Sequence, residues 1–359
     1  MRSITAFIFN LSKGGAQGVF VTVMNYFADK GYQVNVVVQN LCDDIHSRDL
    51  RENIDVHSLE CTSARNSLMK LIRYVKHREI EYAWVFGPEM AVNLYIAKVI
   101  SRKKFPIYAR SINTLSEEFK RTKSFFRKHI THMMIKCLYH NVNAIVAQSK
   151  NMETDLIKNY GFNPEQVYVI NNALSDKYEE ELKVMPIQLN HKYFLYAGRL
   201  EEQKGLKMLL ESFAGMKVNN VELYIVGEGT QKEELLQYVG KLGISHKVRF
   251  IGYTDNMINY YRSAIATVLT SYYEGFPNVL IESLSCGTPI VSFDLPSGPK
   301  EIITSDNGIL VEYLNVEKMA KALDAAALRN WNRQDIKLSA ERYSQKVILQ
   351  KYSKMMCTN

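Results

Sequence analysis

Short apolar runs alternate with amphipathic stretches along this chain, and the alternation occurs twice, once in each half. In the first half the apolar runs are residues 4–9, 34–38, 83–86, 106–109, 144–147 and 167–170. In the second half they are residues 193–197, 221–226, 248–251, 266–269 and 289–293. Continuous apolar strands separated by helical patterns are typical of parallel β-α-β units. The pattern therefore predicts an α/β fold with two Rossmann-like, doubly wound domains in tandem.

Helical patterns lie between most of these runs. They include residues 19–30 and 67–77 in the first half, and 204–213, 231–241, 256–263, 278–285 and 299–303 in the second. Beyond residue 310 the pattern is helical to the end, and residues 340–356 fit one long helix. Ligands of doubly wound sheets bind outside the carboxyl ends of the strands. With two such domains, we expect the site in the cleft between them.

Residues 174–191, between the two halves, interrupt the alternation of apolar runs and helical patterns. This stretch is polar and acidic from Ser175 to Glu181 and then contains Pro186. Such a break is typical of a linker. The expected organisation is listed in chain order as a first domain over residues 1–173, a linker over 174–191, a second domain over 192–339 and a C-terminal segment over 340–359.

The composition excludes several classes of protein. The chain has 359 residues, of which 47% are hydrophobic and 23% charged, which is unlike a disordered or collagen-like chain. Its five cysteines are odd in number and form no CxxC pair, which argues against a disulfide framework and a cysteine-built zinc site. No apolar stretch reaches the roughly 18–20 residues of a membrane span, and the run 4–9 is too short for a signal peptide. We therefore expect a cytoplasmic protein.

The excess positive charge lies in the first half. Residues 1–173 contain 23 Lys and Arg against 15 Asp and Glu, whereas the remainder contains 22 of each. The basic residues are densest at 102–104 and 120–136. Four apolar side chains of the second segment fall at helical spacing, namely Phe126, Ile130, Met133 and Met134. A basic helix with an apolar face suits an anionic membrane surface; the alternative is an ordinary amphipathic helix packed on its own domain. No motif favours a nucleic-acid partner.

A glycine pair, Gly14 and Gly15, follows the first apolar run within the sequence KGGAQG. Paired glycines let the backbone approach a ligand closely, and the N-terminus of the following helix attracts negative charge. The motif has neither the GxGxxG spacing nor the lysine of a P-loop, so it matches no standard nucleotide fingerprint. The alternative is a simple tight turn.

Two basic residues, Arg199 and Lys204, follow the apolar run 193–197 on a predicted strand-to-helix loop. Arg offers bidentate hydrogen bonds and Lys a compact charge, so the pair can clamp a diphosphate. The alternative is a salt-bridged loop in which Glu201 and Glu202 are the partners. Glycine-containing loops at 227–229 and 297–299 follow other predicted strands and fall at the same sheet edge.

The segment YEGFPNVLIE places two carboxylates, Glu274 and Glu282, eight residues apart. Glu274 falls in a loop and Glu282 about one turn into a helix that begins near Asn278. Gly275 allows a tight approach, and the helix N-terminus offers N–H groups to a phosphate. The two acids can bind sugar and ribose hydroxyls; the alternative is a buried acid pair that only supports the loop.

At these residues the sequence resembles glycosyltransferase family 4, the retaining group 1 glycosyltransferases of the GT-B fold. The resemblance covers essentially the whole chain and is most specific from Tyr193 to Val311, where the E-x7-E arrangement lies. It implies two Rossmann-like domains facing across a cleft, the first binding the acceptor and the second the nucleotide sugar. It also implies that the last helix crosses back onto the first domain.

The resemblance implies a role for each motif residue. Arg199 and Lys204 match the pair that neutralises the donor diphosphate, Glu274 the acid that contacts the transferred sugar, and Glu282 the acid that holds the ribose. The remaining donor-binding positions it implies are Gly14, Gly15, Gly252, Tyr253, Gly275, Phe276, Asn278 and Val279. Many family members also have a His near the reacting sugar. Here the comparable stretch is YARSIN, in which Arg110 and Asn113 are the candidates to replace it.

The implied reaction transfers a hexose or N-acetylhexosamine, with retention, from a nucleoside-diphosphate sugar to a glycan hydroxyl. UDP is the favoured nucleotide, and no DxD motif is evident, so no metal cofactor is expected. The expected acceptor is linked to polyprenyl diphosphate, in bacterial surface polysaccharide assembly at the inner face of the plasma membrane. Two alternatives remain open, a nucleotide-sugar 2-epimerase and a non-catalytic nucleotide-sugar-binding subunit. A dinucleotide-dependent oxidoreductase is disfavoured because no GxGxxG follows any strand.

Overall fold

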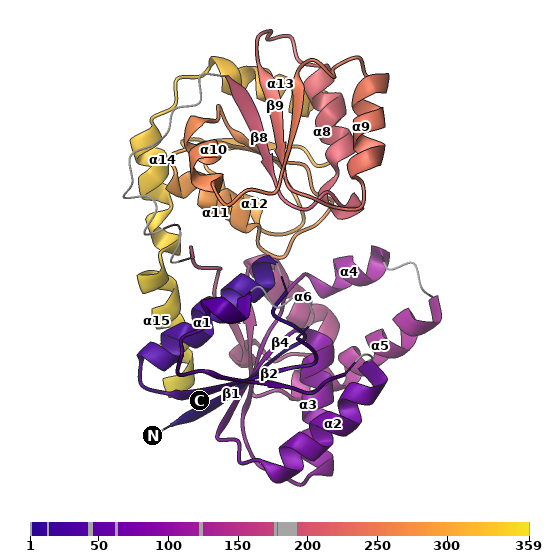
Figure 1. The fold of residues 1–359 in the computed structure, drawn as a ribbon, viewed down its shortest axis with the longest axis vertical. Coiled ribbons are helices and arrows are strands. Elements are labelled where there is room, and N and C mark those ends of the chain that lie inside the picture. Colours follow the sequence, from indigo (N-terminus) through magenta and orange to yellow (C-terminus); the bar gives the residue numbers. More distant parts are fainter. Residues whose placement is uncertain are drawn as a thin grey trace. The chain divides into compact units, whose positions relative to one another are not determined.

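A computed structural model describes residues 2–12, 14–41, 46–61, 64–121, 125–175, 178 and 192–358, without the side chains of 64–66, 121, 125–128, 357 and 358 (Figure 1). The chain divides into two compact units. The N-terminal unit comprises Met1–Ser175 and Ile348–Asn359, and the C-terminal unit comprises Asp176–Val347. Most of the predicted linker, residues 176–177 and 179–191, lies outside the described residues.

The N-terminal unit contains a seven-stranded parallel sheet in the order β3-β2-β1-β4-β5-β6-β7. Its strands are β1 (Ser3–Ile8), β2 (Gln33–Val38), β3 (Asp55–Ser58), β4 (Tyr82–Phe86), β5 (Ile107–Arg110), β6 (Ala144–Ala147) and β7 (Val167–Val169). Its helices are α1 (Gly15–Asp29), α2 (Ala64–His77), α3 (Pro88–Ile100), α4 (Leu115–Arg121), α5 (Phe125–Leu138) and α6 (Lys150–Tyr160). Short 3-10 turns are η1 (His46–Asp49), η2 (Tyr139–Asn141) and η3 (Pro164–Gln166).

The C-terminal unit contains a six-stranded parallel sheet in the order β10-β9-β8-β11-β12-β13. Its strands are β8 (Tyr193–Ala197), β9 (Glu222–Val226), β10 (Val248–Gly252), β11 (Thr267–Leu269), β12 (Ile290–Phe293) and β13 (Gly308–Val311). Its helices are η4 (Glu202–Lys204), α8 (Leu206–Ala214), α9 (Lys232–Lys241), α10 (Met257–Ser263), α11 (Asn278–Ser285), α12 (Pro299–Ile302), α13 (Val316–Leu328), α14 (Arg333–Ser339) and η5 (Glu341–Tyr343). Both sheets are doubly wound, as the alternating pattern predicts.

The apolar strands are buried on both faces, which is why their sequences read as continuous runs. In β1, Phe7 packs into the core on one face of the sheet, while Ile4, Ala6 and Ile8 pack into the core on the other. The sequence pattern did not predict two of the strands, β3 and β13. β3 is an edge strand with no buried residue, so it has no apolar run to detect, and β13 lies where the pattern suggests the start of a helical region.

The C-terminal segment differs from the single helix expected over 340–356. The chain forms η5, leaves the helical conformation at Ser344 (φ −59°, ψ 151°), and begins α15 (Gln345–Thr358) one residue later. The inward face of α15 packs into the core of the N-terminal unit through Ile348, Leu349, Tyr352, Met355 and Met356. The end of the chain thus belongs to the same compact unit as its beginning.

Three of the five cysteines, Cys61, Cys137 and Cys286, are free thiols. Cys42 lies outside the described residues, and the side chain of Cys357 is not described. No helix among the described residues is long and apolar enough to cross a bilayer.

Candidate functional site

The strand order of the C-terminal sheet reverses at β8, which has β9 on one side and β11 on the other. Loops that leave two adjacent parallel strands toward opposite faces separate and open a crevice at the carboxyl edge. Arg199 and Lys204 follow β8, and Glu274 follows β11. The sheet topology thus brings the basic pair and the loop carboxylate of the sequence motifs to one switch point.

Lys204 and Glu274 form an ion pair across this point, with 2.6 Å between Lys204 Nζ and Glu274 Oε1. The lysine side chain is 17% exposed and the carboxylate 10%. Ser271 Oγ also donates to Glu274 Oε1, at 2.6 Å. Among the described residues nothing donates to the other oxygen of Glu274, Oε2. The partner of Lys204 is therefore a residue 70 positions away, and not Glu201 or Glu202 of its own loop.

Further hydrogen bonds join the same two loops. Tyr272 N donates to Gln203 O at 2.8 Å, Gln203 Nε2 donates to Tyr273 O at 2.9 Å, and Thr270 Oγ1 donates to Lys204 O at 3.2 Å. Gly205, which ends η4, has φ +63°. A Cβ at this position would lie 2.3 Å from the carbonyl oxygen of Thr270. Only glycine fits this close approach of the two backbones.

Arg199 has an exposed side chain at the start of the β8 loop. No described carboxylate lies within ion-pair distance of its guanidinium. Glu201, the nearby acid of the loop, instead accepts hydrogen bonds from the N–H and the hydroxyl of Thr230 at 3.1 and 2.8 Å. Backbone hydrogen bonds at 3.0 Å from Gly198 N to Val226 O and at 2.9 Å from Leu200 N to Glu228 O hold the loop that carries Arg199.

Glu282 lies on the fifth residue of α11, as the sequence predicts, and is partly buried. Its Oε2 accepts hydrogen bonds from the hydroxyls of Tyr178 and Tyr261 at 3.0 and 2.9 Å. Burial raises the pKa of Glu282 above its ordinary value of 4.5, although the two hydroxyls oppose this shift. Oε1 accepts no hydrogen bond from a described residue, so it can still bind a ligand hydroxyl.

The N-terminus of α11 begins at Asn278, followed by Val279, and lies directly after the loop of Glu274. Pro277 precedes the first turn and has no side-chain acceptor that could cap it. A helix N-terminus of this kind attracts an anion. Gly275 is held through its carbonyl oxygen by Ser297 Oγ at 3.0 Å. The side chain of Phe276 is buried against Tyr343, with ring centroids 5.7 Å apart, so only its backbone is available to a sugar.

Gly252 ends β10 with φ +77° and lies beside Glu228, whose Oε1 would be 2.9 Å from an added Cβ. Tyr253 is exposed and donates to Asp255. Gly14 and Gly15 belong to the other unit, where Gly14 precedes α1 in an extended conformation and Gly15 begins it. Lys13 of that motif lies outside the described residues. The roles of these four glycine and tyrosine positions in donor binding stay predictions.

The stretch that replaces the family histidine contains a buried arginine. Arg110 has no exposed surface; its Nε donates to Tyr352 of α15 at 2.9 Å, and its Nη2 donates to Asn172. Its guanidinium also lies over the ring of Phe86, 5.4 Å from the centroid. The side chain thus fastens α15 to the N-terminal sheet and is enclosed away from any substrate. Asn113 remains the candidate for the histidine position.

Sequence reasoning missed the partners that orient the two carboxylates. Ser271 lies three residues before Glu274, in a loop with no periodic pattern. Tyr261 lies on α10, an ordinary amphipathic helix, and is one of many tyrosines in the chain. Tyr178 falls in the stretch predicted as a linker. A tyrosine at these positions carries no local signal, because its role depends on where α11 lies in the folded unit.

We expect Gly205→Ala to lower the melting temperature by roughly 4–8 °C, since the strained φ and the contact with Thr270 cost about 2 kcal/mol. Gly240→Ala is the matched control, because an added Cβ there on α9 meets nothing within 4 Å. The control should unfold at the same temperature as the parent chain or slightly above it. Equal melting temperatures for the two variants would contradict the close approach.

We expect Glu282→Gln to raise the melting temperature at pH 8, because it removes a charge that burial disfavours while keeping an oxygen for the two tyrosines. The raised pKa means that the folded state binds the proton more tightly, so Glu282 becomes destabilising as the pH rises above 4.5. The difference between the variant and the parent chain should therefore shrink as the pH falls toward 4.5. If the difference in melting temperature between the variant and the parent chain did not change with pH, ionisation of Glu282 would not be its cause.

Comparison with known proteins places the chain in one family. The profile described as Glycosyltransferase Family 4 matches residues 13–177, and the profile described as Glycosyl transferases group 1 matches residues 177–343. The two matches meet between the units and together cover most of the chain.

Full-length relatives agree with these matches. The chain is 28% identical over 335 residues to the N-acetylgalactosamine-N,N'-diacetylbacillosaminyl-diphospho-undecaprenol 4-alpha-N-acetylgalactosaminyltransferase of Campylobacter jejuni, covering 90% of this chain and 89% of that protein. It is 26% identical over 322 residues to the amylovoran biosynthesis glycosyltransferase AmsD of Erwinia amylovora, covering 87% and 86% of the two chains.

The fold matches a solved structure, that of Anabaena Alr3699/HepE in complex with UDP-glucose. The TM-score is 0.78 over the whole of both chains, at 19% identity. With the two doubly wound sheets and the residues gathered at the switch point, these matches show that the chain is a glycosyltransferase of family 4 with the GT-B fold.

Proposed function

We propose that this glycosyltransferase moves a hexose or N-acetylhexosamine from a nucleoside-diphosphate sugar to a glycan hydroxyl, with retention at the anomeric carbon. The observation that carries the proposal is the ion pair of Lys204 and Glu274, with Arg199 on the same loop and the N-terminus of α11 after Glu274. These groups combine positive charge for a diphosphate with an open carboxylate oxygen for a sugar.

Transfer breaks the bond from the anomeric carbon to the phosphate oxygen, whose electron pair goes to the diphosphate, and forms a bond from the acceptor hydroxyl oxygen to the same face of that carbon. The leaving phosphate oxygen takes the proton of the acceptor hydroxyl. Lys204 has three N–H donors, so it can keep its bond to Glu274 while it donates to a phosphate oxygen. Arg199 offers a bidentate donor pair, and the first turn of α11 adds partial positive charge. Fixed donors of this kind stabilise charge where it develops in the transition state.

The two carboxylates would hold the donor by its hydroxyls. Glu274 Oε2 and Glu282 Oε1 are the oxygens to which no described residue donates. A sugar hydroxyl on Glu274 and a ribose hydroxyl on Glu282 would complete their hydrogen bonding. The ion pair and the tyrosine pair orient these oxygens before the donor binds, which reduces the entropy lost on binding.

We further propose UDP as the nucleotide and no metal requirement. The HepE structure contains UDP-glucose, which supports uridine as the base. The cations of Arg199 and Lys204 would take the place of a metal ion at the diphosphate. Turnover that is unchanged by EDTA is the expected result.

The acceptor that we propose is a glycan linked to a lipid diphosphate, in the assembly of a bacterial surface polysaccharide. The name of the Campylobacter relative specifies a diphospho-undecaprenol acceptor, and that of the Erwinia relative specifies amylovoran biosynthesis. The excess basic charge of residues 1–173 is also suited to an acceptor that carries phosphate groups.

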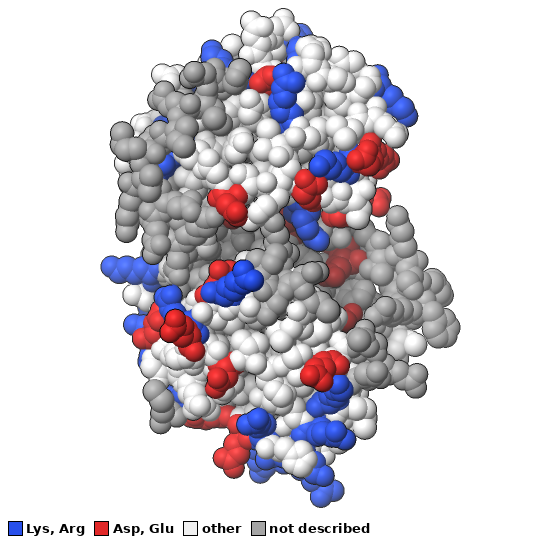
Figure 2. Space-filling model, in the orientation of Figure 1, with Lys and Arg blue, Asp and Glu red and all other residues white. Residues whose placement is uncertain are grey.

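Peripheral binding to an anionic membrane, on its cytoplasmic side, completes the proposal. The predicted basic segment, residues 120–136, falls on the end of α4 and on α5. Residues 122–124 lie outside the described part, and so does the side chain of Phe126. On α5, Ile130 and Met133 are 49% and 62% exposed, whereas Met134 packs on the core. Lys and Arg side chains also lie at the lower end of the N-terminal unit in Figure 2, next to acidic ones. Lys136 on the same helix is exposed as well. Exposed apolar side chains on a helix with basic residues favour anionic lipid.

The donor proposal is tested first with a thermal-shift panel of UDP, GDP, ADP and their common sugars. We expect stabilisation by UDP and UDP-sugars, and its loss in Arg199→Ala. Lys204→Gln keeps a hydrogen-bond donor for Glu274 but removes the charge, so we expect turnover to fall about 100-fold. Lys207→Gln removes the same charge from the exposed first turn of α8 and should leave turnover unchanged. Equal turnover in the two variants would contradict the role of Lys204.

The reaction type is tested by product analysis. Transfer releases UDP only when an acceptor is present, and an NMR spectrum of the first product should show the anomeric configuration of the donor. Conversion of the UDP-sugar into an epimer without acceptor would instead identify a 2-epimerase. Binding of UDP-sugar without either reaction would favour the non-catalytic subunit.

The membrane proposal is tested by flotation with vesicles of anionic or neutral lipid. We expect the protein to float only with anionic vesicles, and a double variant Ile130→Ser and Met133→Ser to float less. Leu236→Ser, an exposed apolar side chain on α9, is the control and should float like the parent chain. Equal and negligible flotation with both lipids would overturn the proposal.

A further inference from the structure

The sheet of the N-terminal unit has a topological switch point of its own. Its strand order reverses at β1, which has β2 on one side and β4 on the other. The loop after β1 leads to α1 on one face of the sheet, and the loop after β4 leads to α3 on the other face. Loops that separate in this way open a crevice at the carboxyl edge. The proposed donor site uses none of the residues that follow β4 and β5.

The loops after β4 and β5 lie against each other at this edge. Gly87 N donates to Arg110 O at 3.1 Å, and a Cβ added at Gly87 would lie 3.4 Å from Cδ1 of Ile112. Glu89 is the second residue of α3 and is exposed, while Asn113 follows Ile112 and is partly buried. The contact between the loops brings Glu89 and Asn113 into the same neighbourhood.

Glu118 on α4 is close to both of these residues. Its carboxylate is partly buried and forms a hydrogen bond with the side chain of Asn113. Burial raises the pKa of Glu118 above its ordinary value of 4.5, the bond with Asn113 opposes this rise, and the nearby negative charge of Glu89 adds to it. Two carboxylates and one amide, from three different elements, thus meet at this edge.

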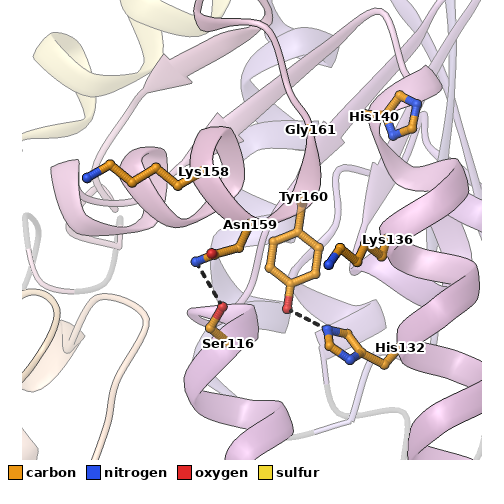
Figure 3. A pocket seen from close by; sticks show the side chains of 8 residues that line it. All are labelled: Ser116, His132, Lys136, His140, Lys158, Asn159, Tyr160 and Gly161. Carbon is orange, nitrogen blue, oxygen red and sulfur yellow. Dashed lines mark hydrogen bonds between the residues drawn. The ribbon is translucent and has the colours of Figure 1, made fainter.

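Hydrogen bonds hold α4 and the loop before it in place. Ser116 N donates to the carboxylate of Asp155 on α6 at 3.1 Å, and Asn159 Nδ2, also on α6, donates to Ser116 Oγ at 3.3 Å (Figure 3). The buried Gln148 donates through Nε2 to Ser111 O at 2.7 Å, which fixes the loop after β5. Polar groups that are fixed before a ligand arrives bind it with a smaller loss of entropy.

Phe9 adds apolar surface to the same edge. The register of β1 and β4 pairs Phe7 with Val85, so Phe9 follows β1 at the level at which Gly87 follows β4. The side chain of Phe9 is 47% exposed. Sites for small ligands typically combine apolar or aromatic surface with a few polar groups. The edge offers both.

The charge of these groups limits what they can bind. Ionised carboxylates only accept hydrogen bonds, so they match the hydroxyl and N–H groups of a sugar. They repel a ligand that carries a carboxylate or phosphate of its own. We propose that Glu89, Asn113 and Glu118 bind the terminal sugar of the acceptor, beside Phe9, and select an uncharged sugar over an acidic one. This inference rests on the proposed function and adds to it the class of acceptor sugar.

A structural role would also explain the position of Glu118. It lies in the first turn of α4, and its N–H donates to Thr114 O at 3.1 Å. An acidic side chain near a helix N-terminus stabilises the helix. A carboxylate with this role alone affects the melting temperature but not the choice between sugars, so the two roles are separable by measurement.

The test measures the binding of methyl glycosides to the full chain by saturation-transfer NMR at constant ionic strength. Two matched pairs are used, glucose with glucuronic acid and galactose with galacturonic acid, whose members differ only in the oxidation of C6. For at least one pair we expect the uncharged member to bind roughly tenfold or more tightly than the acidic one. In Glu89→Gln and Glu118→Gln we expect this preference to fall by roughly threefold or more.

Glu165→Gln is the matched control, because it removes the same charge from an exposed residue of η3, which precedes β7 and so lies at the opposite edge of the sheet. It should change the preference by no more than about twofold. The inference is overturned if neither uncharged glycoside binds, if both members of each pair bind equally, or if all three variants show the same preference. A lower melting temperature with an unchanged preference would assign Glu118 to helix stabilisation alone.

The same titration in Glu274→Gln separates this inference from the proposed function. Sugar binding that persists in Glu274→Gln supports a sugar site in the N-terminal unit. Sugar binding that is lost in Glu274→Gln but unchanged in Glu118→Gln would assign the sugar to the proposed donor site and overturn the inference. A thermal shift with UDP but no binding of any glycoside would overturn the inference and leave the proposed function intact.

Discussion

The ion pair between Lys204 and Glu274 is the interaction on which the proposed donor site depends. It joins the loops after β8 and β11, which leave the sheet at its topological switch point. A buried ion pair contributes little net stability, because desolvation offsets most of its attraction. The ion pair matters here for geometry, because it joins the two loops and leaves Glu274 Oε2 without a described hydrogen-bond donor. The close approach of the backbones of Gly205 and Thr270 joins the same two loops.

The two units share the doubly wound architecture but carry different sets of side chains. The C-terminal unit contains the Lys204–Glu274 pair, Glu282 and the N-terminus of α11, the set to which we assign the nucleotide sugar in our proposal. The N-terminal unit contains the basic excess and exposed apolar side chains on α5. Our proposal assigns the substrate with the leaving group to the C-terminal unit and the substrate with the accepting hydroxyl to the N-terminal unit.

Helix α15 lies at the end of the chain but packs into the core of the N-terminal unit. Tyr352 accepts from the buried Arg110, and Trp84 Nε1 donates to Met356 Sδ at 3.4 Å. Arg110 therefore serves the core of its unit, although its place in the sequence suggests a role toward the sugar. The lesson is that a charged residue at the carboxyl end of a strand is a site candidate only if its side chain reaches the surface.

The sequence by itself determined the two parallel sheets, most strand positions, and the residues of the site motifs, because buried parallel strands and strand-to-helix loops have strong local patterns. It could not reveal the exposed edge strand β3, the break before α15, or the tyrosines that orient Glu282. Only the tertiary structure decided which groups meet: the partners of Glu274, Glu282 and Arg110 lie 70, 104 and 242 positions away. Such contacts depend on how the elements pack, and local periodicity contains no information about them.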